Sequence, residues 1–238
     1  MTTQTLERRW LGDYKMPKTE VRAADKGKRI VGHAAVFNKT SQNLGGFVEE
    51  VAPGAFAKTI QEADVRGLIN HDVNILLARN RASTLELEED GVGLAYSIDP
   101  PDTTVARDWM VLLERGDITQ SSFSFRAINV EWGLTQDDFP KRTLIEVALY
   151  DVGPVTFPAF LDADAGVSGR MAALADLAER RSVSLNEVVE LAKHNELRDL
   201  IADTQPKPGP GPNPTADLSV ARRRLELQEK RWASQGAG

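Results

Sequence analysis

The sequence predicts a β-rich, mixed α/β fold in which a barrel-like antiparallel sheet with flanking helices is followed by a C-terminal helical extension. Short runs rich in β-branched and aromatic residues follow one another between turn-forming residues, and few of the intervening segments have helical periodicity. Many strands with few helices favour such a sheet over a βαβ array. The 238 residues suffice for one domain with a sizeable core and additional segments.

The predicted strands are separated by polar or glycine-containing turns. We expect strands at 29–37, 47–51, 66–69, 84–88, 93–98, 121–132 and 142–155, and short helices at 54–63 and 103–115. Serine and phenylalanine alternate in the strand that begins at residue 121. Ser122 and Ser124 therefore share one face, and burial of the phenylalanines on the other face would orient the serines toward a groove.

Composition changes along the chain define the predicted domain organisation. We expect an N-terminal extension at 1–28, a β-rich main domain at 29–163, a helical extension at 164–203, a Pro/Gly-rich linker at 204–215 and an amphipathic basic helix at 216–238. Ser184 and Glu187 form a possible capping box within the helical extension. We expect this extension to pack on the main domain or on a second subunit.

Composition also excludes several classes of function. The absence of cysteine removes disulfides, thiolate metal ligands and a cysteine nucleophile. The formal net charge of −6 disfavours nucleic acid as a partner. No apolar run approaches the roughly 20 residues that a transmembrane helix needs, and the first residues contain no signal-peptide core. We expect no membrane association and a protein that stays in the compartment where it is made.

The chain contains three histidines, and their surroundings differ. His33 lies within a strand-like run, where a structural role is the better interpretation, and His194 lies on the polar face of a predicted helix. His71 follows an apolar strand in Asn70-His71-Asp72, at a strand end from which a side chain can enter a cleft. His71 is therefore the histidine for which a functional role is as plausible as a structural one.

Two acids in the last predicted strand are candidate partners of a histidine. Glu146 interrupts an otherwise apolar run, and a carboxylate there costs free energy unless it is paired. Asp151 has the opposite parity if the strand is regular, so the two acids would face different sides. An arginine partner for Glu146, and polar serines at a half-exposed strand edge, remain alternatives on these residues alone.

Six short blocks, in order, resemble the HK97-type prohead proteases, the capsid maturation peptidases of tailed phages. They are GHAAVFN (32–38), VAPGAF (51–56), LINHD (68–72), GDI with SFSF (116–125), EVALYDV (146–152) and VTFPA (155–159). The resemblance spans about residues 29–163 and implies that this part of the chain is the catalytic domain. That family is in turn similar to the herpesvirus capsid maturation proteases, which implies a herpesvirus-protease-like fold.

The resemblance implies a serine endopeptidase with Ser122 as nucleophile and His71 as base. Alignment with the third triad position of the herpesvirus enzymes places Glu146 there, with Asp151 in reserve. Pro154 and Val155 stand where those enzymes have arginines that help build the oxyanion site, so oxyanion donors would come from elsewhere. The resemblance implies no cofactor and no metal.

The implied substrate is the major capsid protein's scaffolding segment or a separate scaffold, cleaved within the assembling prohead in the host cytoplasm. Self-cleavage and a homodimeric state are further expectations. Two other functions compete with this prediction. One is a non-catalytic scaffold or capsid-assembly protein on the same fold. The other is a metal-dependent hydrolase that uses His71 and Asp72, although no H-E-x-x-H motif supports it.

Overall fold

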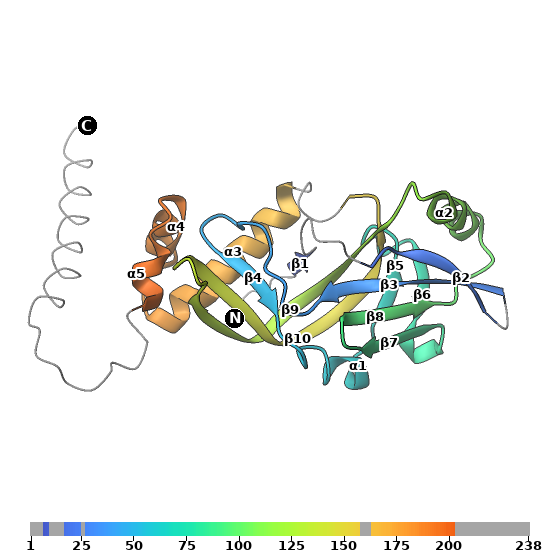
Figure 1. Ribbon diagram of the computed structural model, residues 1–238, viewed down its shortest axis with the longest axis horizontal. Coiled ribbons are helices and arrows are strands. Elements are labelled where there is room, and N and C mark those ends of the chain that lie inside the picture. The colour runs from blue at the N-terminus through green and yellow to red at the C-terminus, as the bar shows by residue number, and fades with distance from the viewer. Residues whose placement is uncertain (1–6, 10–16, 25–26, 158–162, 203–238) are drawn as a thin grey trace, which may run out of the picture. The chain divides into compact units, whose positions relative to one another are not determined.

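The computed structural model describes residues 7–9, 17–24, 27–157 and 163–202, whose strands form two sheets (Figure 1). The six-stranded sheet has the order β1 (Glu7–Arg9), β9 (Gln120–Leu134), β10 (Pro140–Val155), β5 (Arg66–Leu68) and β6 (Leu76–Arg79), and β4 (Val48–Val51) also pairs with β10. The four-stranded sheet has the order β2 (Glu20–Ala24), β3 (Gly27–Val36), β8 (Gly93–Ile98) and β7 (Leu85–Glu89).

This topology corrects the expectation of a barrel-like antiparallel sheet. Within the described ranges the strands make two open sheets and no closed barrel. The larger sheet is mixed, because β10 runs antiparallel to β9 but parallel to β4 and β5. Strand β10 is long enough to pair with β4 near its beginning and with β5 near its end, so two different strands share one of its edges.

The main core is built from strand residues whose alternation was visible in the sequence. Phe123 and Phe125 of β9 are fully buried, with ring centroids 5.0 Å apart, and Phe123 also contacts Phe56 at 5.5 Å. They pack with buried residues of the four-stranded sheet, including Ile30 and Leu94. Since this face of β9 is buried, Ser122 and Ser124 are directed to the opposite face.

The helices within the main domain are short, and each begins or ends at an identifiable residue. They are α1 (Thr59–Glu62), the 3-10 helix η1 (Asn80–Ala82) and α2 (Thr104–Arg115). Thr103 caps α2 by accepting a hydrogen bond from the amide of Ala106, and Gly116 ends it with a positive φ of 81°. The expected helix at 103–115 is confirmed, whereas the one expected at 54–63 is helical only at 59–62 and is preceded by a turn.

The helical extension packs on the same unit as the sheets. It consists of α3 (Ala163–Arg181), α4 (Leu185–Lys193) and α5 (Leu197–Ala202). Its buried residues surround Phe47, whose ring lies 5.1 Å from that of Trp132 on β9. Ser184 accepts a hydrogen bond from the amide of Glu187, which is half of the expected capping box. The linker and the basic helix expected at 204–238 lie outside the described residues.

A buried ion cluster connects β1 to β4 and β10. Arg142 is 1% exposed and donates to Glu7 at 2.9 and 3.2 Å and to Glu49 at 2.8 Å. Burial alone would lower the pKa of Arg142, but the two carboxylates outweigh it and raise the pKa above its ordinary value. Parts of the expected N-terminal extension therefore belong to the sheets, since Glu7 lies in β1 and residues 20–24 pair with β3.

Candidate active site

Ser122 is fully buried in the middle of the larger sheet. It lies on β9 directly before the core residue Phe123 and opposite Gly153 of β10. At this point β10 also approaches β5 closely, because a Cβ added to Gly153 would overlap the carbonyl oxygen of Leu68. Glycine at 153 thus permits the end of β5, and the residues that follow it, to come near the nucleophile candidate.

His71 follows β5 in a tight turn with an unusual backbone. Asn70 and His71 have positive φ values of 52° and 58°, a region that side-chain-bearing residues adopt only where the surroundings stabilise it. The amide of Asn70 donates to the carbonyl of Pro154 at 3.1 Å, and its side-chain oxygen accepts from the amide of Thr156 at 2.8 Å. These bonds join the turn to the end of β10 and fix the direction of the His71 ring.

The His71 ring lies between a hydroxyl and a carboxylate. Its Nε2 is 2.8 Å from the Ser122 hydroxyl oxygen, and its Nδ1 is 2.5 Å from Oδ1 of Asp151. A carboxylate can only accept, so Nδ1 carries the proton and Nε2 accepts the hydrogen bond from Ser122. Both the histidine and the aspartate side chains are less than a tenth exposed, at 7% and 9%. The three groups form one continuous, nearly dry chain of hydrogen bonds.

A bulge in β10 directs Asp151 to this face. Leu149 pairs with Phe125 and Asp151 pairs with Ser124, so Tyr150 is an extra residue between them. In a regular ladder Tyr150 would oppose Ser124 and Asp151 would oppose Phe123 on the core face. The hydroxyl of Ser124, also fully buried, donates to Oδ2 of Asp151. Both carboxylate oxygens therefore have partners.

The expectation that Glu146 would be the acid on His71 is not met by the structure. Glu146 lies opposite Asn129, and its carboxylate contacts the ammonium of Lys58 at 3.3 Å near the surface. At about 3.3 Å per residue, this position is roughly 20 Å along the strand from Gly153, the residue paired with Ser122. Glu146, the acidic residue that interrupts the apolar strand, thus forms an ion pair near the surface.

The adjacent hydroxyl, Ser121, has a different environment from Ser122. It points to the other face of β9, where its oxygen lies 2.6 Å from the Tyr96 hydroxyl and also contacts Thr19. Burial raises the pKa of Tyr96 to about 12, so this phenol stays protonated. The Ser121 hydroxyl belongs to a neutral buried network between the two sheets.

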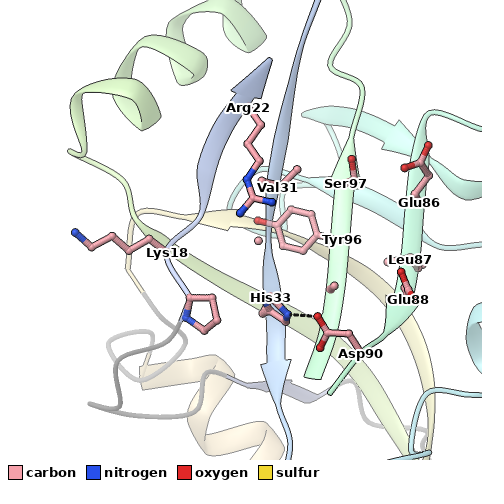
Figure 2. A pocket seen from close by; sticks show the side chains of 13 residues that line it. Lys18, Arg22, Val31, His33, Glu86, Leu87, Glu88, Asp90, Tyr96 and Ser97 are labelled. Carbon is pink, nitrogen blue, oxygen red and sulfur yellow. Dashed lines mark hydrogen bonds and ion pairs between the residues drawn. The ribbon is translucent and has the colours of Figure 1, made fainter. Parts of the chain in front are cut away.

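A second histidine–aspartate pair lies in a pocket of about 500 Å³ on the four-stranded sheet (Figure 2). His33 Nε2 is 2.8 Å from Asp90, whose other oxygen accepts from the amides of Val92 and Gly93. Burial alone would raise the pKa of Asp90, but these hydrogen bonds outweigh it and the pKa is lowered. Asp90 closes the turn of the β7–β8 hairpin and joins it to His33 on β3. This contact is of the structural kind expected for His33. His194 is exposed, as expected.

Across the ranges that the structure describes, no group of three histidine, aspartate or glutamate side chains could hold a metal ion. No helix in the described part of the chain combines the length and apolar character needed to cross a membrane.

The sequence of this chain matches the model of one protein family. The family model described as caudovirus prohead serine protease matches residues 14–176, which is more than half of the chain. The chain belongs to this family. The resemblance stated from the sequence blocks is thereby confirmed.

Solved structures and curated proteins provide two further comparisons. Among solved structures, the bacteriophage T4 capsid assembly protease, gp21, is similar to 65% of this chain over 98% of its own, with 13% sequence identity and a TM-score of 0.37. No curated protein matches the chain.

The sequence pattern did not single out one residue of the candidate site and ranked another second. Ser124 was seen only as a neighbour on the serine face, although its position two residues after Ser122 placed it on that face. Asp151 was the reserve acid, because the bulge at Tyr150 has no signature in composition or spacing. The available signal for Ser124 was its spacing: a polar residue two positions after the nucleophile candidate Ser122 lies on the same face of the strand.

Proposed function

We propose that this chain is a serine endopeptidase in which Ser122 is the nucleophile, His71 the general base and Asp151 the acid that orients the histidine. The observation that carries the proposal is the hydrogen-bond chain from the Ser122 hydroxyl through both ring nitrogens of His71 to Asp151. A hydroxyl, an imidazole and a buried carboxylate in this order are the groups that acyl transfer requires. Asp151 takes the role that the sequence assigned to Glu146.

The reaction begins when the Ser122 oxygen attacks a peptide carbonyl and its proton passes to Nε2 of His71. The tetrahedral intermediate collapses with cleavage of the C–N bond, and the same proton is transferred to the leaving amine. Water then attacks the acyl-enzyme ester, giving up its proton to His71, and the carboxylic acid product leaves as the proton returns to Ser122. No oxidant, metal or further co-reactant is needed for this balance.

Asp151 contributes charge and orientation in both steps. When His71 is protonated, the imidazolium lies beside the Asp151 carboxylate in a site that excludes most water, where the attraction is stronger than at the surface. Ser124 keeps the second carboxylate oxygen occupied and so fixes the plane of the carboxyl group. Ser124 is a positioning residue, because its hydroxyl acts through Asp151.

The substrate that we propose is the scaffolding segment of the major capsid protein or a separate scaffold. Cleavage would take place inside the assembling prohead in the host cytoplasm, and the chain itself is a further substrate. A homodimer and a herpesvirus-protease-like relationship of the fold remain part of the proposal. Membership of the prohead serine protease family supports the substrate class.

Co-expression with the capsid-protein precursor of the same phage tests the proposal. The wild-type chain should generate new N-termini that mass spectrometry identifies, and Ser122→Ala should abolish them while the protein stays folded. Ser121→Ala is the matched control, because it removes a neighbouring buried hydroxyl that faces the other side of β9. Equal processing by wild type and Ser122→Ala would instead favour a non-catalytic assembly protein.

A further inference from the structure

Strand β1 pairs with β9 beside the nucleophile candidate (Figure 1). Its register is antiparallel, with Glu7 opposite Phe125 and Arg9 opposite Phe123. The ladder therefore ends at Phe123, the residue that directly follows Ser122 on β9. A segment from the start of the chain lies along the edge of the strand that carries the reactive hydroxyl.

The other edge of β9 is not accessible to a peptide. Strand β10 covers it along almost the whole length of β9, from Gln120 to Leu134. His71 and Asp151 also approach Ser122 from the side of β10, since Asp151 lies on β10 and His71 follows β5, the next strand. A peptide that adds to β9 next to Ser122 must therefore use the edge that β1 occupies.

An extended peptide is the conformation in which a protein chain adds to a sheet edge through its backbone. Backbone pairing at the edge of β9 would place a substrate carbonyl alongside Ser122, whose hydroxyl lies within a hydrogen bond of His71. β1 makes this type of contact with three residues of β9. Helix α3 also lies against β1, so the position occupied by β1 is bounded by β9 on one side and α3 on the other.

The attachment of β1 depends on a short ladder and on one buried side chain. Glu7, 2% exposed, binds Arg142 through both of its carboxylate oxygens. Arg142 also binds Glu49. Departure of Glu7 would leave Arg142 paired with Glu49. Release of β1 therefore leaves no unpaired cation in the core.

We propose that the edge of β9 from Phe123 to Phe125 is the binding site for the extended substrate peptide, and that β1 occupies this site until the substrate strand replaces it. This inference rests on the proposed function. It specifies how the substrate binds, and it identifies β1 as an intramolecular competitor of the substrate.

The variant Glu7→Gln tests the competition in the full-length chain, since it removes the charge that attaches β1 and leaves the Arg142–Glu49 pair. The probe is a quenched fluorescent peptide that spans the junction identified in the capsid precursor. We expect kcat/KM for this peptide to rise at least about fivefold, because the fraction of chains with an open edge increases. Glu20→Gln, which removes an exposed carboxylate on β2, is the matched control and should leave the rate unchanged.

A fluorophosphonate probe separates the two hypotheses. It reacts with Ser122 without strand pairing, but Ser122 is fully buried while β1 is in place, so labelling of Glu7→Gln should be at least as fast as that of wild type. If labelling is normal but Glu7→Gln leaves peptide cleavage unchanged or lowers it, the inference about β1 is overturned and the catalytic proposal stands. If neither wild type nor Glu7→Gln is labelled at Ser122, the proposed function fails and the inference fails with it.

Hydrogen–deuterium exchange gives an independent measurement that does not require Glu7→Gln to fold. In the full-length Ser122→Ala variant, the junction peptide should increase exchange in residues 7–9 as it replaces β1. Residues 123–125 should stay protected, because one strand takes the place of another. Unchanged exchange in residues 7–9 at a saturating peptide concentration would overturn the inference.

Discussion

Asp151 faces Ser124 across the β9–β10 ladder, and this pairing results from the extra residue, Tyr150, on β10. The bulge moves the aspartate from the core face to the face of the nucleophile candidate. One residue of backbone irregularity thus determines whether Asp151 can reach His71, whereas Glu146 lies too far along β10 to do so.

Asp151→Asn should lower kcat by about 10³- to 10⁴-fold, because an amide does not stabilise the imidazolium and favours the wrong histidine tautomer. Glu146→Gln is the control on the same strand and should change kcat by less than about twofold, since Glu146 pairs with Lys58. Steady-state cleavage of the junction peptide measures both. A larger loss in Glu146→Gln than in Asp151→Asn would restore Glu146 as the third member.

Ser124→Ala should lower kcat by roughly tenfold with little effect on KM. Hydrogen bonds to charged groups contribute about 1.5–3 kcal/mol, and part of that would be lost in the orientation of Asp151. The double variant with Asp151→Asn distinguishes positioning from a general structural role. Its loss should equal that of Asp151→Asn alone, whereas additive losses would show that Ser124 acts independently of the aspartate.

Gly153→Ala should destabilise the protein by more than about 2 kcal/mol, because the added methyl group meets the backbone of Leu68. Gly133→Ala on β9 is the matched control, since no heavy atom lies within 4 Å of a Cβ at that position. Urea unfolding of the two variants measures the difference. Similar midpoints for both would mean that β5 and β10 can separate at low cost.

Arg142→Met should destabilise the protein by about 3–5 kcal/mol, because it removes a buried cation that pairs with the carboxylates of Glu7 and Glu49. Adding Glu7→Gln and Glu49→Gln to this variant should recover a large part of the loss. Thermal unfolding of the single and triple variants tests this expectation. Failure of the glutamine replacements to recover stability would assign the effect to lost packing of the arginine side chain.

Much of the fold was predictable because most strands follow simple alternation. The strands expected near 29–37, 84–88, 93–98, 121–132 and 142–155 all occur, with ends within a few residues. Strands β1, β2 and β6 were missed. They are three to five residues long, and β1 and β2 are rich in charged residues, so their pairing comes from tertiary contacts that local pattern does not encode.

The candidate site was predictable as far as its separate elements were regular. His71 at a strand end and Ser122 opposite a buried phenylalanine face were expected, and the structure brings them within a hydrogen bond. The acid depended on strand parity over five residues from Glu146 to Asp151. Parity is lost at each bulge, and β10 has irregularities on both sides of Glu146 as well as at Tyr150.

The pairing of β1 with β9 has a consequence for synthesis of the chain. Glu7 leaves the ribosome on the order of ten seconds before Phe125, at typical rates of translation. Residues 7–9 therefore join the sheet late, after β9 has emerged. A protein fused on the N-terminal side of Glu7 would affect the pairing of β1 with β9, which forms last. Most of both sheets could already have formed by then.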